Sequence, residues 1–215
     1  MNRVFLTAVL VANAVTPAAA QLAGMPVWNS PKGGTGVTIS GDYGRPNADL
    51  NKGNAFGARG TVGLGSLSLT AGLATWKPSG APNSLTSVGG DAAFRVIGGS
   101  LLPVNVNLLV GGARTSVGGG GGSITTLIAG GGVSVSLPTP GFSIEPYLSL
   151  ANRWHRQTVA SVSNTESNIG WTIGANLGFG MMGAHIAYDS EKLGAGSTGS
   201  IIGIGVHLSL KVPMM

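Results

Sequence analysis

Large apolar side chains alternate with small or polar ones along most of the chain. Between Trp171 and Gly180, the odd-numbered residues are Trp, Ile, Ala, Leu and Phe, and the even-numbered ones are Thr, Gly, Asn, Gly and Gly. Successive side chains of a strand point to opposite faces, so this period of two predicts strands with one apolar and one polar face. The pattern predicts strands at 36–44, 55–65, 67–76, 87–98, 102–114, 124–137, 142–155, 167–179, 181–190 and 199–211.

The connections between these segments alternate in length. Short ones fall at 65–66, 99–101, 138–141 and 180, and longer ones at 45–54, 77–86, 115–123, 156–166 and 191–198. Tight turns at one end and longer loops at the other, joining an even number of strands, are typical of bacterial outer-membrane barrels. We therefore predict an all-β fold, a closed antiparallel up-and-down transmembrane β-barrel of ten strands, with eight strands as the alternative.

Composition indicates which face of the strands is outside. Only 9% of the residues are charged and the mean hydropathy is +0.33, whereas ordinary soluble domains carry roughly 25% charged residues. A soluble barrel would need a charged outer face, but the polar face here consists mostly of Gly, Ser and Thr. We expect the apolar face to contact lipid and the polar face to line the lumen. A soluble glycine-rich extracellular β-protein is the alternative.

The first twenty residues have the pattern of a signal peptide. Arg3 precedes a mostly apolar stretch at 4–15, and Ala18, Ala19 and Ala20 provide the small residues of a cleavage site before Gln21. A transmembrane helix is the alternative, but the apolar stretch is too short to span a bilayer. This pattern predicts export, and with the barrel pattern it predicts location in the bacterial outer membrane.

Three further segments complete the predicted organisation. We expect 21–35 to form a short periplasmic leader outside the barrel, because Pro26, Pro31 and the Gly33-Gly34 pair deny it a regular strand. The barrel itself is expected at 36–211, and a C-terminal tail at 212–215.

These features together resemble the small outer-membrane β-barrel proteins of the OmpA and OmpX kind. The resemblance is architectural and covers about 35–211. It implies a monomer that the outer-membrane insertion machinery assembles, and it implies a fold more strongly than an activity. The family's last strand usually ends in an aromatic residue, whereas this chain ends in Leu210 followed by Lys, Val, Pro, Met and Met.

Aromatic residues gather at one level of the predicted barrel. Most fall on the apolar face at strand ends next to the longer loops, as expected of a girdle at the membrane interface. Ordinary packing within the sheet is the alternative. The predicted girdle consists of Tyr43, Trp76, Trp154, Trp171 and Tyr188, of which Trp76 has the opposite parity.

Charged residues of both signs fall on the predicted inner face. We expect them to pair with one another and stiffen the wall, and the alternative is a polar lumen that passes small solutes. This lumen charge network comprises Asp42, Arg59, Asp91, Arg95, Glu145, Arg153 and Asp189.

Candidate chemistry is sparse. His155, His185 and His207 share the inner face, but His185 and Asp189 lie four residues apart on one strand, about 13 Å, too far for a hydrogen bond. No likely ligands have the short one-sided spacing of a metal site, and the chain has no cysteine. We expect no catalytic residue, metal or cofactor. The net charge of +5 arises from scattered basic residues, so we expect no nucleic-acid partner.

The favoured function is a non-enzymatic outer-membrane barrel with a structural, adhesive or surface-binding role. A narrow pore for small solutes is the alternative, and an envelope lipid-modifying or hydrolytic barrel enzyme is a further one. Basic residues exceed acidic ones around the long loops, where we expect contact with the phosphates of outer-membrane lipid and lipopolysaccharide. The basic residues are Arg45, Lys52, Lys77, Arg114, Arg156 and Lys192, and the acidic ones are Asp49, Glu166 and Glu191.

Overall fold

The computed structural model describes residues 21–99, 102–120, 122–159, 162–193 and 196–210, so the predicted signal peptide and tail lie outside the described residues. Within this part of the chain, no helix is both long and apolar enough to cross a membrane. The elements are β1 (Gly34–Pro46), η1 (Ala48–Leu50), β2 (Asn54–Gly65), β3 (Leu67–Lys77), β4 (Leu85–Ile97), β5 (Val104–Val117), η2 (Gly118–Gly120), β6 (Ser123–Val135), β7 (Leu137–Thr139), β8 (Phe142–Val159), β9 (Val162–Phe179), β10 (Met182–Lys192) and β11 (Thr198–Leu210).

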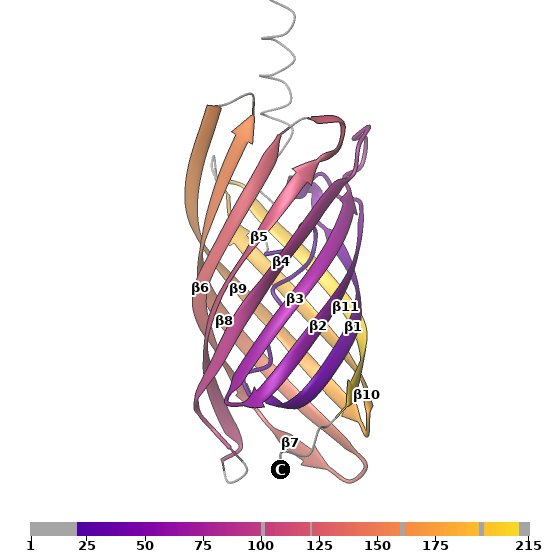
Figure 1. The fold of residues 1–215 in the computed structure, drawn as a ribbon, viewed down its shortest axis with the longest axis vertical. Coiled ribbons are helices and arrows are strands. Elements are labelled where there is room, and N and C mark those ends of the chain that lie inside the picture. The colour runs from indigo at the N-terminus through magenta and orange to yellow at the C-terminus, as the bar shows by residue number, and fades with distance from the viewer. Residues whose placement is uncertain (1–20, 100–101, 121, 160–161, 194–195, 211–215) are drawn as a thin grey trace, which may run out of the picture.

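Ten of these strands form a closed ring (Figure 1). Each pairs antiparallel with its neighbour, β1 pairs with β11, and β6 pairs with β8. The three-residue β7 pairs with β8 as a small extension beside the short turns. The predicted ten-strand antiparallel barrel is therefore confirmed. We call the end with the short turns the turn end and the other the loop end.

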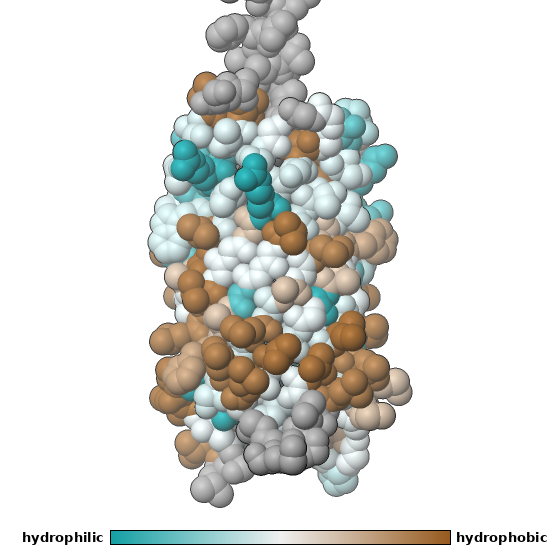
Figure 2. Space-filling view, viewed as in Figure 1, coloured by the Kyte–Doolittle hydropathy of each residue, from teal (hydrophilic) through white to brown (hydrophobic). Residues whose placement is uncertain are grey.

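Opposite faces of each strand meet different surroundings. On β11, Ile204 and Val206 are 53% and 65% exposed, and apolar side chains of the other strands are exposed on the outer wall in the same way. Figure 2 shows these hydrophobic residues gathered over the middle and the turn-end half of the wall. The inner wall holds mainly Gly, Ser, Thr, Asn and buried charges. Water would solvate such an outer surface poorly, whereas the hydrocarbon of a bilayer matches it.

The β8–β9 hairpin is longer than the pattern predicts. Each strand has 18 residues, and the first six residues of β9 are exposed on both faces. Alternation fails there because neither face is buried, which is why the sequence pattern placed the strand start at 167. Pairing between β9 and β10 starts only at Gly170, so within the described residues the loop-end part of β9 has one unpaired edge.

The segment 21–33 lies inside the barrel, which corrects the predicted periplasmic leader. It forms no strand, as its prolines predict, but Ala23 and Met25 are 0% and 1% exposed. Figure 1 shows its indigo coil passing between the walls. The physical reason is that Leu22, Met25 and Val27 are apolar and the inner wall, rich in glycine, leaves space for them. Residues 34 and 35 belong to β1.

Candidate functional site in the barrel lumen

We call residues 21–33 the plug. It forms a loop that starts at mid-height, rises toward the loop end and then descends to β1. Backbone N–H groups of the plug donate to wall side chains: Ala23 to Ser87 Oγ (3.1 Å), Val27 to Asp189 Oδ2 (3.3 Å) and Lys32 to Glu145 Oε1 (2.8 Å). These acceptors belong to β4, β10 and β8, so the plug is attached to several sides of the lumen.

The part of the plug that runs toward the turn end contacts a group of polar wall residues near that end, which we call the lower cluster. Its members are Glu145, Asn107, Ser149 and Asn176. The side-chain amide of Asn29 donates to Ser149 Oγ (2.9 Å), and the amide of Asn107 donates to Asn29 Oδ1 (2.8 Å). Ser30 Oγ donates to Glu145 Oε2 (2.8 Å), and Asn176 donates to the Asn29 carbonyl (3.0 Å). The plug thus satisfies polar groups that the wall buries.

A central cluster surrounds Trp28 of the plug. Arg59 contacts Asp42 at both carboxylate oxygens (2.7 and 3.1 Å), and His185 Nε2 lies 2.6 Å from Asp42 Oδ1. Trp28 packs edge-on against His185 with ring centroids 4.5 Å apart, and the Arg59 guanidinium lies 5.2 Å from the Trp28 ring centroid.

Close approach in the central cluster requires glycine at position 205. A Cβ there would collide with His185 Nε2, and it would lie 2.6 Å from Asp42 Oδ1. His207, on the same strand, places its Nδ1 3.2 Å from His185 Nδ1. The small residues of the inner wall therefore make room for charged side chains as well as for the plug.

A second group of buried polar side chains, toward the loop end, belongs to the wall strands, and we call it the upper cluster. Its members are Arg153, His155, Thr172, Asp189 and Glu191. Arg153 donates to Asp189 (2.7 and 2.8 Å) and to Glu191 (3.1 Å), and all three side chains are fully buried. Glu191 also lies 2.8 Å from His155 Nε2. Thr172 donates to Asp189 Oδ2 (2.5 Å). Strands β8, β9 and β10 supply these residues, so the cluster ties three neighbouring strands together.

The upper cluster contains the elements of a catalytic relay, but it is not accessible. Thr126 Oγ1 lies 3.1 Å from His155 Nδ1, and the other nitrogen of that ring faces Glu191. The Thr126 side chain is buried, and Glu191 is already held by Arg153. The adjoining pocket, lined in part by His155, has about 20 Å³ of free space, room for a water molecule and far below a substrate-sized cleft.

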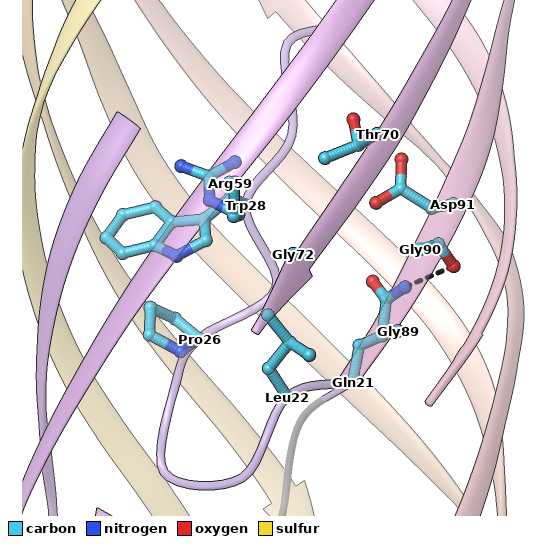
Figure 3. A pocket seen from close by; sticks show the side chains of 10 residues that line it. All are labelled: Gln21, Leu22, Pro26, Trp28, Arg59, Thr70, Gly72, Gly89, Gly90 and Asp91. Carbon is cyan, nitrogen blue, oxygen red and sulfur yellow. Dashed lines mark hydrogen bonds between the residues drawn. The ribbon is translucent and has the colours of Figure 1, made fainter. Parts of the chain in front are cut away.

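A second pocket lies beside the plug (Figure 3). Figure 3 shows Trp28 and Pro26 on one side of it and Asp91 and Gln21 on the other, with the Gln21 amide donating to the Gly90 carbonyl at 2.5 Å. Its free space is also about 20 Å³. Among the described residues, no group of three or more His, Cys, Asp or Glu side chains could hold a metal ion.

All seven residues of the predicted lumen network lie on inward positions, but they do not form one network. Two opposite-charge pairs form, Arg59 with Asp42 and Arg153 with Asp189. The other three residues correct the expectation of mutual pairing, because each contacts the plug. Glu145 accepts from Ser30 and Lys32, Arg95 donates to the Lys32 carbonyl, and Asp91 lines the pocket beside Gln21.

Four of the five predicted girdle residues lie on the outer wall. Tyr43, Trp154, Trp171 and Tyr188 face outward, and the rings of Trp171 and Tyr188 lie 5.5 Å apart. Trp76 does not belong to the girdle: it is 2% exposed, faces the lumen and donates from its indole N–H to the Lys52 carbonyl (2.9 Å). The parity of β3 decides its direction, and its level along the barrel does not.

Sequence reasoning missed the plug and misplaced Glu191. The sequence pattern predicts that Glu191 lies in a long loop, but β10 continues to Lys192 and its alternation turns Glu191 inward. The apolar character of Leu22, Met25 and Trp28 was the available signal for the plug, since a leader in water would gain nothing from them.

The comparisons with known proteins agree with this architecture. No protein-family model matches the chain, and neither does any curated protein. The solved β domain of the Bordetella autotransporter BrkA is 12% identical, with a TM-score of 0.50, over 82% of this chain and 100% of that one. The N-terminal barrel of Pseudomonas aeruginosa OprF is 14% identical, with a TM-score of 0.38, over 83% and 99%. The NalP translocator domain of Neisseria meningitidis is 15% identical, with a TM-score of 0.42, over 80% and 88%. The likeness to the BrkA domain confirms the predicted resemblance to outer-membrane barrels as a resemblance of fold.

Proposed function

We propose that this chain is a non-enzymatic protein of the bacterial outer membrane, a barrel closed by its own N-terminal segment that acts through its wall and its loop-end surface. The observation that carries the proposal is the plug, which occupies the lumen and bonds to strands on several sides of it. A barrel whose lumen is occupied has two surfaces left to work with, the lipid-facing wall and the external loops.

The filled lumen disfavours the pore and the enzyme. Both lumen pockets beside the plug and the upper cluster have room for about one water molecule each. The relay of Thr126, His155 and Glu191 is sealed within the wall, so it fits the role of a structural hydrogen-bond network.

The β8–β9 hairpin is the element best suited to a surface-binding role. Its loop-end part is polar, exposed on both faces and unpaired along one edge within the described residues. Thr158 and Ser163 join its strands by a side-chain hydrogen bond of 3.0 Å, which helps to hold the ribbon in shape. A stiff exposed ribbon with a free edge can present side chains and backbone groups to a partner.

Conductance across planar bilayers tests the closed barrel. The protein beginning at Gln21 should insert without opening a steady ion channel, and a variant that lacks 21–33 should conduct. The control deletes residues 79–82 of the β3–β4 loop, which lie at the loop end and are exposed or half-buried, and this control should stay closed. Steady conductance by the intact protein would contradict the proposal.

A further inference from the structure

Outward-facing charges on the barrel strands follow one rule. The strands β1, β3, β5, β8 and β10 run toward the loop end, and each carries one outward basic residue near that end. Within the described strands, no acidic side chain faces outward and the turn-end half of the outer wall carries no charge. The five basic residues are Arg45, Lys77, Arg114, Arg156 and Lys192.

Two of these residues converge on one strand. Arg114 of β5 is opposite Thr125 of β6, and Thr125 is opposite Arg156 of β8. The two arginines are therefore separated by two strand spacings, about 10 Å between their backbones, with an outward hydroxyl between them. All three side chains are exposed, and within the described residues neither arginine has an ion-pair partner. We call these three residues the arginine row.

The outward residues on either side of the arginine row change from polar, toward the loop end, to apolar, toward the turn end. One step toward the loop end, the facing outward residues of β4, β5, β6, β8 and β9 all carry hydroxyl groups, and they are Thr86, Ser116, Ser123, Thr158 and Ser163. One step toward the turn end, Leu127 faces Trp154, and both are exposed. From the loop end to the turn end, the outer surface therefore presents hydroxyl groups, then arginines, then Trp154 and Leu127. This is the order of sugar, phosphate and acyl chain in an outer-leaflet glycolipid.

From this arrangement we propose that the arginine row is a binding site for a phosphate group of a lipid in the surrounding leaflet. Two guanidinium groups donate in fork geometry to the phosphate oxygens and Thr125 adds a third donor, while Trp154 lies against the upper part of the acyl chains. The inference deepens the proposed function and rests on it, because it needs the outer wall to face lipid.

Calorimetric titration in dodecyl maltoside micelles tests the site with the full barrel. The probe is dihexanoyl phosphatidic acid, with dihexanoyl phosphatidylcholine and inorganic phosphate as comparison ligands. The variant R114Q/R156Q is matched by K77Q/K192Q, which removes the same charge from two residues that are not separated by a single strand. Heat-modifiable gel mobility shows separately that each variant is a folded barrel, so loss of the barrel is distinguished from loss of the site.

We expect R114Q/R156Q to weaken phosphatidic acid binding by about tenfold or more and K77Q/K192Q by less than about threefold. Phosphatidylcholine and inorganic phosphate should bind much more weakly than phosphatidic acid. Equal losses in the two variants would show a diffuse charge effect and overturn the site, and equal affinity for inorganic phosphate would overturn the lipid as its source. If R114Q/R156Q folds poorly, Thr125→Val keeps both arginines and should weaken binding by about threefold.

Discussion

The upper and lower clusters both bury carboxylates against the inner wall, but different parts of the chain satisfy them. In the upper cluster, Asp189 and Glu191 are held by Arg153, which belongs to the wall. In the lower cluster, Glu145 receives hydrogen bonds from Ser30 and Lys32 of the plug, and from the wall residues Ser134 and Asn176. The upper cluster therefore stabilises mainly the barrel, with one hydrogen bond from Val27 of the plug, whereas the lower cluster stabilises the barrel and plug together.

This difference has a consequence for how the plug is retained. A buried carboxylate that loses its donors carries a desolvation cost, so withdrawal of the plug would leave Glu145 and Asn107 under-satisfied unless water entered. Asp189 would keep Arg153 and Thr172. Most of the hydrogen bonds between the plug and the wall thus lie at the end of the plug that continues into β1.

Arg153→Ala should give the largest effect. It leaves two buried carboxylates without their shared cation, and breaking such a group typically costs about 3–5 kcal/mol. The expected result is that loss in the free energy of unfolding from lipid vesicles, measured by urea titration. The control Arg95→Ala removes a guanidinium that donates to the Lys32 carbonyl, and it should cost less than about 1 kcal/mol. Similar losses in the free energy of unfolding of both variants would contradict the proposal that the wall-held carboxylates stabilise the barrel more than a contact with the plug does.

Glu145→Ala should have a smaller effect on the barrel and a clear one on the plug. Removing the acceptor of the Ser30 and Lys32 bonds should cost about 2 kcal/mol. Hydrogen exchange should accelerate at the amide of Lys32 while the amides of β9 and β10 keep their protection. Glu166→Ala is the control, because Glu166 is exposed and lies in the projecting hairpin. An unchanged exchange rate at Lys32 would show that the carboxylate does not retain the plug.

Asn29→Ala should be the mildest of the three substitutions. The side-chain amide bonds Asn107 and Ser149, but the Asn29 carbonyl still accepts from Asn176 after the substitution. We expect a loss of about 1–2 kcal/mol in the same urea titration and no steady conductance. A conducting variant would mean that this one side chain, and not the whole plug, closes the lumen.

Local alternation was enough to predict the barrel, but not what fills it. Apart from the short β7 and the exposed start of β9, the strands alternate between the outer wall and the lumen, so parity predicts the direction of Arg59, Asp189 and Trp171 from the sequence alone. Trp76 and Glu191 are predicted wrongly for two different reasons. Trp76 is assigned from its level along the barrel and Glu191 from an expected loop, whereas the parity of their strands turns both side chains inward. The second partner of Asp42 cannot be found in this way, because His185 lies 143 residues away and meets it only after the ring closes.

The position of the plug depends on the lumen as a whole. Segment 21–33 has no periodicity, and its prolines exclude a strand without saying where the coil goes. Its apolar side chains needed burial, and the glycines of the inner wall supplied the space, but the fit of the two appears only in three dimensions.

Hydrogen exchange of the plug amides in the folded protein, followed by mass spectrometry in vesicles, tests the central claim most directly. The N–H groups of Ala23, Val27 and Lys32 each donate to a wall side chain. If 21–33 occupies the lumen, these three amides should exchange slower than an unstructured peptide by about a hundredfold or more. Exchange of all three at the rate of an unstructured peptide would place the segment outside the barrel and contradict the account.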